Sequence, residues 1–246
     1  MRYFIIFAYC GKDFHGSQTQ PNGITVQETM ETAFATILRE PVSLTFAGRT
    51  DAGVHAEHMV AHFDWNKPLP ANLVGRLNNL LPASIAIRDI RRVADDAHAR
   101  FDALARTYYY RITTRKDPFL CINHTRVAPG LDFEAMNDAA QLMLGRQDFA
   151  SFCRVHTDVK TTFCDVTEAR WIQTSDTEYY FVITADRFLR NMVRAVVGTL
   201  FDIGRGKLTR AQFADIIAAH NRSRAGHSAP PEGLSLVNIV YPENYS

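Results

Sequence analysis

Residues 43–65 read S-L-T-F-A-G-R-T-D-A-G-V-H-A-E-H-M-V-A-H-F-D-W, and this stretch predicts two strands joined by a glycine-bracketed loop. Residues 43–46 form the short first strand. Residues 58–65 form the second, because apolar side chains alternate along one face: Met59, Ala61 and Phe63. The loop between them, residues 47–55, contains two glycines that permit a sharp turn or a close backbone approach.

Strands and helices are mixed on both sides of this stretch. Further strands are expected at residues 3–9, 85–93, 107–113, 169–173, 178–185 and 234–241. Helices are expected at residues 25–38, 69–81, 133–144, 188–203 and 209–219, with Thr25 and Thr209 as N-caps. This order predicts an α+β fold of two halves packed side by side. The expected halves are residues 1–104 and residues 105–246.

The composition is that of an ordinary soluble globular protein. The 246 residues are 46% hydrophobic and 22% charged. No apolar run approaches the roughly 20 residues that span a bilayer, and residues 1–9 resemble a first strand more than a signal peptide. The four cysteines, Cys10, Cys121, Cys153 and Cys164, form no C-x-x-C pair, so free thiols and a cytoplasmic setting are expected.

Positive charge is clustered although the net charge is only +1. The three groups are Arg88, Arg91, Arg92, Arg100, Arg106, Arg111, Arg115 and Lys116; Arg187, Arg190 and Arg194; and Arg205, Lys207, Arg210, Arg222 and Arg224. Such local patches bind phosphates even when acidic residues elsewhere balance the total. Ordinary solvated surface explains any single group equally well.

The loop of residues 47–55 carries the residues best suited to chemistry. Asp51 stands within a few residues of two glycines, and Arg49 is placed to reach a phosphate or a displaced base. A structural D-A-G turn between two strands is the alternative.

Three histidines, His55, His58 and His62, suggest a zinc site as a rival interpretation. On a strand only His58 and His62 share a face, and no H-E-x-x-H or C-x-x-C motif supports a metal. No metal is therefore expected, and a metal-dependent hydrolase is the weaker alternative.

Two other segments could contribute to a site. On the helix expected at residues 188–203, Arg187, Arg190 and Arg194 lie at i, i+3 and i+7 beside the apolar stripe. Arg194 lies deepest and would hold a carboxylate such as Asp51 ionised. In residues 106–111, R-T-Y-Y-Y-R, Tyr108 could stack on a base, although buried core tyrosines are the commoner case.

Together these residues resemble the bacterial tRNA pseudouridine synthases of the TruA branch, which act on the anticodon arm. The resemblance runs nearly end to end. It rests on Y-C-G-K-D-F-H-G-S-Q-T-Q (9–20), T-V-Q-E (25–28), A-G-R-T-D-A-G-V-H-A (47–56), D-A-H-A-R-F (96–101), A-R-T-Y-Y-Y (105–110), M-V-R-A-V-V-G (192–198) and E-G-L-S-L (232–236).

The resemblance implies a fold, an activity and partners. The fold is two ferredoxin- or RRM-like α+β halves that share a central antiparallel sheet, with the active-site cleft between them. The activity is isomerisation of uridine to pseudouridine at tRNA positions 38 to 40. A homodimer that binds tRNA across both subunits, in the cytoplasm and with no cofactor, is implied as well.

Roles follow for individual residues by the same resemblance. Asp51 matches the catalytic aspartate. The substrate-binding residues would be Tyr108, which packs on the target base, Arg49, which helps to extrude it, Arg194, which pairs with the aspartate, and Leu234. Contacts with tRNA would come from Lys67, His98, Ala99, Arg100, Phe101, His156, Lys160 and Arg190.

One departure is visible where the family commonly has tryptophan before glutamine and this chain has Ser17. The loss of an aromatic side chain there bears on substrate range more than on chemistry. The sequence does not choose whether Asp51 attacks ribose C1′, adds to uracil C6 or removes a proton from C2′. A non-catalytic RNA-binding relative is a further alternative.

Overall fold

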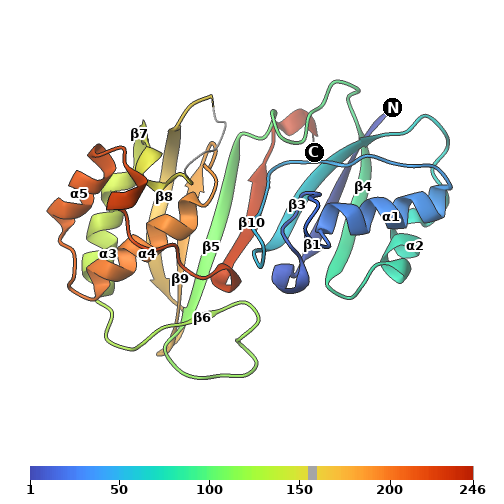
Figure 1. The fold of residues 1–246 in the computed structure, drawn as a ribbon. Helices are drawn as coiled ribbons and strands as arrows, with labels where there is room; N and C mark the ends of the chain where they lie inside the picture. The colour runs from blue at the N-terminus through green and yellow to red at the C-terminus, as the bar shows by residue number, and fades with distance from the viewer. Residues whose placement is uncertain (155–159, 246) are drawn as a thin grey trace. The chain divides into compact units, whose positions relative to one another are not determined.

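The computed structural model describes residues 1–154 and 160–245, and it divides into two compact units (Figure 1). The first unit consists of Met1–Leu104 together with Leu236–Ser246, and the second consists of Ala105–Ser235. In each unit α-helices accompany a mostly antiparallel set of strands, so the predicted α+β class is confirmed. None of the helices described is long and apolar enough to cross a membrane.

The first unit has strand order β4-β1-β3-β10. The strands are β1 (Arg2–Tyr9), β3 (His55–Asp64), β4 (Ile85–Val93) and β10 (Leu234–Val240), whose last five residues belong to this unit. The short β2 (Thr45–Phe46) pairs antiparallel with β3. Since β1 pairs antiparallel with both β3 and β4, it lies at the centre of this group.

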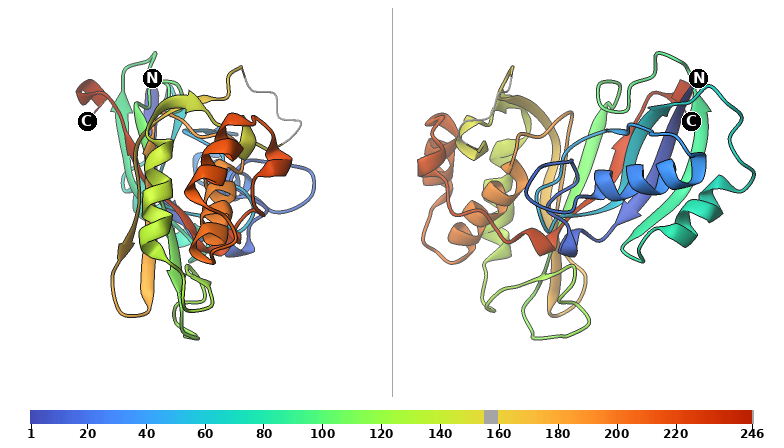
Figure 2. Two further views of the ribbon diagram at one scale, coloured as in Figure 1. Left: turned by 90° about the vertical axis from the view of Figure 1, so that its left-hand side faces the viewer. Right: turned by 45° about the vertical axis from the view of Figure 1, so that its right-hand side comes forward.

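Two helices, α1 (Val26–Leu38) and α2 (Leu73–Leu80), lie on one face of these strands (Figure 2). Thr25 begins α1 as predicted, because its side chain accepts the backbone N–H of Glu28 at 3.3 Å. The core between helices and strands is aromatic, and the rings of Phe34 and Phe63 meet edge to face at 5.1 Å.

The second unit has strand order β5-β9-β8-β7. These strands are β5 (Ala105–Thr113), β7 (Gly145–Asp148), β8 (Phe163–Gln173) and β9 (Glu178–Ala185), all antiparallel to their neighbours. The two-residue β6 (Thr125–Arg126) runs parallel to β5.

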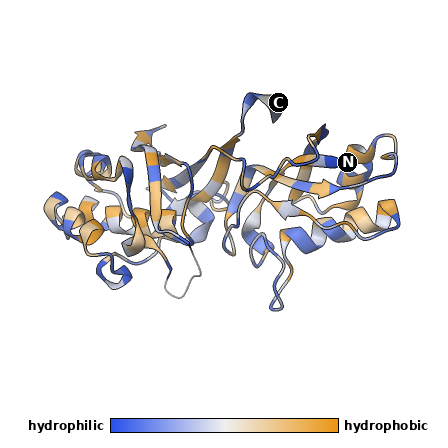
Figure 3. Cartoon of the chain, turned by 90° about the horizontal axis from the view of Figure 1, so that it is seen from above, coloured by the Kyte–Doolittle hydropathy of each residue, from blue (hydrophilic) through white to orange (hydrophobic). Residues whose placement is uncertain are grey.

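The helices α3 (Phe133–Ala140), α4 (Met192–Gly204) and α5 (Arg210–Ala218) lie together on one side of the second unit's strands (Figure 2). Coloured by hydropathy, the helices of each unit carry both hydrophobic and hydrophilic stretches (Figure 3). Many of the apolar residues are buried: α4 is buried at most of its positions, and Phe213 of α5 is fully buried. Burial of these faces, more than intrinsic propensity, stabilises the helices.

Most predicted elements are confirmed, although several boundaries differ. The helix predicted at residues 188–203 begins only at Met192, because Asn191 takes a left-handed conformation with φ of 66°. The predicted stripe of Arg187, Arg190 and Arg194 on one helix is therefore wrong. Strand β3 begins at His55 and β8 at Phe163, both earlier than predicted.

Candidate active site

Thr50, the residue before Asp51, is held by hydrogen bonds to both its backbone and its side chain. The N–H of Thr50 donates to Oγ of Ser17 at 2.9 Å, and the N–H of Ser17 donates to the carbonyl of Thr50 at 3.2 Å. The hydroxyls of Thr50 and Tyr9 form a third hydrogen bond, 2.8 Å long. All three residues are buried, so these bonds lie away from water, where unpaired polar groups are costly. The chain is thus held firmly immediately before Asp51.

The residues after Asp51 form a tight turn. The N–H of Val54 donates to the carbonyl of Asp51 at 3.2 Å, and Gly53 adopts a φ of 80°, which favours glycine. Next to this turn, Nδ1 of His55 accepts the N–H of Gly11 at 3.1 Å. A Cβ at Gly11 would lie 1.9 Å from the carbonyl oxygen of Val54, so only glycine fits there.

The loop presents polar side chains toward solvent from this fixed backbone. Asp51 is half-buried, whereas Arg49 and Ala52 are exposed. A carboxylate on a rigid, accessible turn is suited to a nucleophile or a general base. The predicted loop thus exists, with Asp51 at its turn and Arg49 free to reach outward.

The three tyrosines of β5 differ in their surroundings. Tyr110 is fully buried, and its hydroxyl meets Thr125 and the carbonyl of Pro230 at 2.8 and 2.9 Å. Burial raises the pKa of Tyr110. Tyr108 is half-buried, and its ring meets Phe188 edge to face at 5.1 Å. The core interpretation therefore holds for Tyr110, while Tyr108 keeps part of its surface accessible.

Arg194 lies in the first turn of α4 and is half-buried. Its Nε donates to the carbonyl of Ala229 at 2.7 Å, and its own carbonyl accepts the N–H of Ala229 at 2.9 Å. These contacts orient the guanidinium. Leu234 is buried at the start of β10. Asp51 and Arg49 belong to the first unit, whereas Tyr108, Arg194 and Leu234 belong to the second.

The predicted RNA-contacting residues 98–101 lie in a compact turn that exposes Arg100 and Phe101, leaves His98 half-buried and buries Ala99 completely. Nδ1 of His98 accepts the N–H groups of Arg100 and Phe101 at 3.1 and 3.2 Å, and Oδ2 of Asp102 accepts the N–H of His98 at 2.6 Å. The hydroxyl of Tyr245 adds a bond to Asp102. Phe101 is 74% exposed although its ring packs 4.2 Å from that of His98. An aromatic ring is therefore held outward by a rigid turn.

The remaining predicted RNA contacts are dispersed. Lys67 forms an ion pair with Glu40, and its Nζ lies 5.8 Å from the ring centre of Trp65. Arg190 is exposed, and its backbone carbonyl accepts the N–H of Arg154. Lys160 is exposed at the start of the segment before β8. His156 lies outside the described residues.

The three histidines of the rival zinc hypothesis do not form a ligand set. Among residues 1–154 and 160–245, no three His, Cys, Asp or Glu side chains are grouped to hold a metal ion. One ring nitrogen of His55 and one of His62 accept backbone N–H groups instead. Burial lowers the pKa of His58 and, with Arg2 and His98 nearby, lowers that of His62 to about 4.

The cationic group at the end of the second unit is largely engaged with protein groups. Arg210 pairs with Asp138 at 3.1 Å, and Arg222 donates to backbone carbonyls and to Ser228. Arg205, which pairs with Asp202 at 3.7 Å, and Lys207 are exposed beside a cavity of about 370 Å³. Much of this predicted patch therefore has a structural role.

All four cysteines are free thiols, as predicted.

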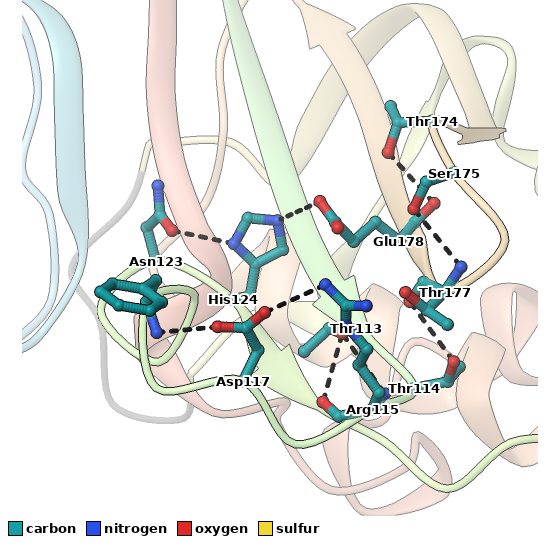
Figure 4. Close-up of polar contacts among 11 residues, drawn as sticks. Thr113, Thr114, Arg115, Asp117, Asn123, His124, Thr174, Ser175, Thr177 and Glu178 are labelled. Carbon is teal, nitrogen blue, oxygen red and sulfur yellow. Dashed lines mark hydrogen bonds and ion pairs between the residues drawn. The ribbon is translucent and has the colours of Figure 1, made fainter.

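One exposed aromatic side chain was missed by the sequence analysis. Asp117 accepts the N–H of Phe119 at 2.9 Å and pairs with Arg115 at 3.1 Å (Figure 4). His124 closes the same loop, with Nε2 3.9 Å from a carboxylate oxygen of Glu178 on β9. Phe119 is 90% exposed on this ordered loop. The contacts link residues 113–124 to the β8–β9 turn, a pairing that local sequence patterns do not reveal.

Comparison with known proteins decides the family. A family model described as tRNA pseudouridine synthase matches residues 139–242. Proteins named tRNA pseudouridine synthase A from Parabacteroides distasonis and Porphyromonas gingivalis are each 53% identical to this chain. The alignments cover 98% and 99% of this chain and 96% and 98% of the relatives. The chain belongs to the tRNA pseudouridine synthase A family.

A third protein of that name, from Bacteroides fragilis, is 52% identical over 98% of this chain and 97% of its own length. The similarity thus spans both units, including the Asp51 loop, β5 and α4. The family resemblance drawn from the motifs is confirmed. Pseudouridine synthases are isomerases, so the enzyme class follows from the family.

Proposed function

We propose that the protein isomerises uridine to pseudouridine in the anticodon stem-loop of tRNA, at positions 38 to 40. In this reaction the bond between ribose C1′ and uracil N1 breaks and a bond between C1′ and C5 forms. C5 loses a proton and N1 gains one, so the reaction involves no oxidation or reduction and takes no atom from a cofactor. Full-length similarity to proteins named tRNA pseudouridine synthase A is the observation that carries this proposal.

Asp51 is the proposed catalytic carboxylate. Support comes from its half-buried position on a turn whose backbone is hydrogen bonded on both sides. A fixed carboxylate avoids the reorganisation that a flexible loop would require during the reaction. Attack at C1′, addition at C6 and proton removal at C2′ all suit a single carboxylate.

Four further residues would bind the target nucleotide. Tyr108 would pack on the extruded base, and Arg49 would help to displace that base from the stack, at a cost of about a few kcal/mol. Arg194 would pair with Asp51 and hold it ionised. Leu234 would line the base site. The partial exposure of Tyr108 and the exposure of Arg49 support these roles.

The tRNA surface would include Lys67, His98, Arg100, Phe101, His156, Lys160 and Arg190, with the buried Ala99 in the same turn as His98. The strongest support is the turn that holds Phe101 outward with the guanidinium of Arg100 5.7 Å from its ring centre. Aromatic rings and arginines together bind unpaired bases and phosphates. We further propose that the protein is cytoplasmic and forms a homodimer. Within each subunit, two ferredoxin-like halves would share a central sheet, with the catalytic cleft between the halves.

Incubation of the purified protein with unmodified tRNA, followed by mapping of pseudouridine at each position, tests the proposal. We expect product at one or more of positions 38 to 40. A non-catalytic RNA-binding relative would bind the same tRNA and leave every uridine unaltered. A metal-dependent hydrolase would require bound metal, which metal analysis of the purified protein would detect.

A further inference from the structure

A buried cluster of three hydroxyl groups fixes the residue that precedes Asp51. Ser17, Thr50 and Tyr9 are 0%, 9% and 4% exposed. They are joined by the three hydrogen bonds at Thr50 described above, which engage its N–H, its carbonyl and its hydroxyl. Every polar group of Thr50 therefore has a partner within this cluster, which we call the Thr50 anchor.

Ser17 connects the Thr50 anchor to the rest of the first unit. Its carbonyl accepts the N–H of Gln27, in the first turn of α1, at 3.0 Å. Gly16 beside it accepts the N–H of Val26 at 3.3 Å and has a φ of 96°. A Cβ at Gly16 would lie 2.9 Å from the carbonyl oxygen of Thr50. A glycine here allows Ser17 to approach the loop closely, so the start of α1 is coupled to the backbone before Asp51.

We infer that Ser17 is a positioning residue for Asp51, acting through the backbone of Thr50. The inference rests on the proposed function of Asp51 and deepens it. The hydroxyl oxygen of Ser17 accepts a hydrogen bond from the Thr50 N–H, and this N–H is the last backbone donor before Asp51. Without that acceptor the buried N–H must find another partner, and the backbone that carries the carboxylate shifts.

A shift in the position of a reacting group lowers the reaction rate more than it lowers the affinity for the substrate. A displacement of about 1 Å at a catalytic group can cost about a hundredfold in rate. The remainder of the tRNA surface is unaffected by a shift confined to this loop. Loss of the Ser17 hydroxyl is therefore expected to reduce the rate constant of the chemical step while tRNA binding is preserved.

The test measures single-turnover rates of pseudouridine formation, the Kd for tRNA and the melting temperature. For Ser17→Ala we expect the rate to fall by about tenfold or more, with the Kd within about twofold of wild type. Thr50→Val removes the bond to Tyr9 and keeps the side-chain shape, so a smaller loss of the same kind is expected. Thr50→Ser retains the hydroxyl and should recover most of the rate.

Ser151→Ala is the matched control. Ser151 is also 0% exposed, and its hydroxyl accepts the N–H of Asn221 at 2.9 Å, but it lies in the second unit. Ser151→Ala should lower the melting temperature, as Ser17→Ala does, and leave the rate of pseudouridine formation unchanged.

Two results would overturn the inference. One is a rate of pseudouridine formation within twofold of wild type in both Ser17→Ala and Thr50→Val. The other is a loss of tRNA affinity, seen as a change in Kd, without a loss of rate. If Ser17→Ala does not fold, Ser17→Cys decides in its place, because sulfur is a weaker acceptor for the Thr50 N–H and the side chain keeps nearly the same shape. An inactive wild-type enzyme would instead overturn the proposed function itself.

Discussion

Nδ1 of His62 accepts the backbone N–H of Ala99 at 3.2 Å, so a buried histidine on β3 holds the turn that displays Phe101. The ring must be neutral at Nδ1 to accept this bond. Desolvation, Arg2 and His98 lower the pKa of His62 to about 4, whereas Asp64 and Asp102 oppose the shift.

The first prediction concerns stability in acid. The folded-state pKa of His62 lies below its unfolded value of about 6.5, so between these values the unfolded chain binds more protons. Stability contributed by neutral His62 is present above pH 6.5 and is lost as the pH falls toward 4, by up to about 3 kcal/mol. Urea unfolding at several pH values measures this loss.

His62→Asn is the control for that measurement. The Oδ1 of asparagine can accept the Ala99 N–H in place of Nδ1 but does not titrate. The variant should lose less stability than wild type between pH 6.5 and 4. Equal pH dependence in the two proteins would assign the acid sensitivity to other groups, such as His58 and His98, whose pKa values burial also lowers.

The second prediction concerns Phe101→Ala. The ring is 74% exposed, so its removal should leave the melting temperature within a few degrees of wild type. Stacking of a base on an aromatic ring is worth about 1 to 3 kcal/mol, so the Kd for tRNA should rise about tenfold. Phe119→Ala removes another exposed phenylalanine, which has no proposed RNA contact. The proposed surface would be contradicted if both variants weakened tRNA binding equally, or if Phe101→Ala did not weaken it.

The third prediction concerns Arg194→Ala. The substitution removes the Nε bond to Ala229, so stability should fall by about 1.5 kcal/mol, and activity should fall because Asp51 loses its proposed partner. Thermal unfolding and pseudouridine formation measure the two effects. Arg205→Ala, just beyond the same helix, removes a partly exposed ion pair with Asp202 and a contact with the Phe201 ring, so it should lower stability slightly and leave activity unchanged. Full activity with an unchanged melting temperature in Arg194→Ala would refute the pairing.

The sequence predicted the regular elements well because their signals are local. Apolar spacing and the Thr25 cap define α1, and alternation defines β4 and β9, which occupy the predicted residues. Asn191 shows the limit of this approach. Phe188 and Leu189 continue the apolar pattern of α4, so periodicity extends the helix through a residue whose left-handed φ breaks it.

Contacts between distant residues were harder to predict. Ser17 lies 33 positions from Thr50, and nothing in its neighbours indicates that its hydroxyl is buried against the Asp51 loop. Its replacement of a usual tryptophan suggested an effect on substrate range, whereas its contacts point to placement of the loop. His55 and His62 likewise suggested metal ligands by spacing alone, and only the structure shows that they accept backbone N–H groups.

Asp51→Asn is the sharpest test of the proposed catalytic role of Asp51. Pseudouridine is measured in unmodified tRNA after incubation with each purified protein, and Asp89→Asn, at an exposed position on β4, serves as the control. We predict that Asp51→Asn forms no pseudouridine above the enzyme-free background while its melting temperature and tRNA binding are retained. Asp89→Asn should be as active as wild type. Substantial pseudouridine formation by purified Asp51→Asn would show that Asp51 is not the catalytic carboxylate.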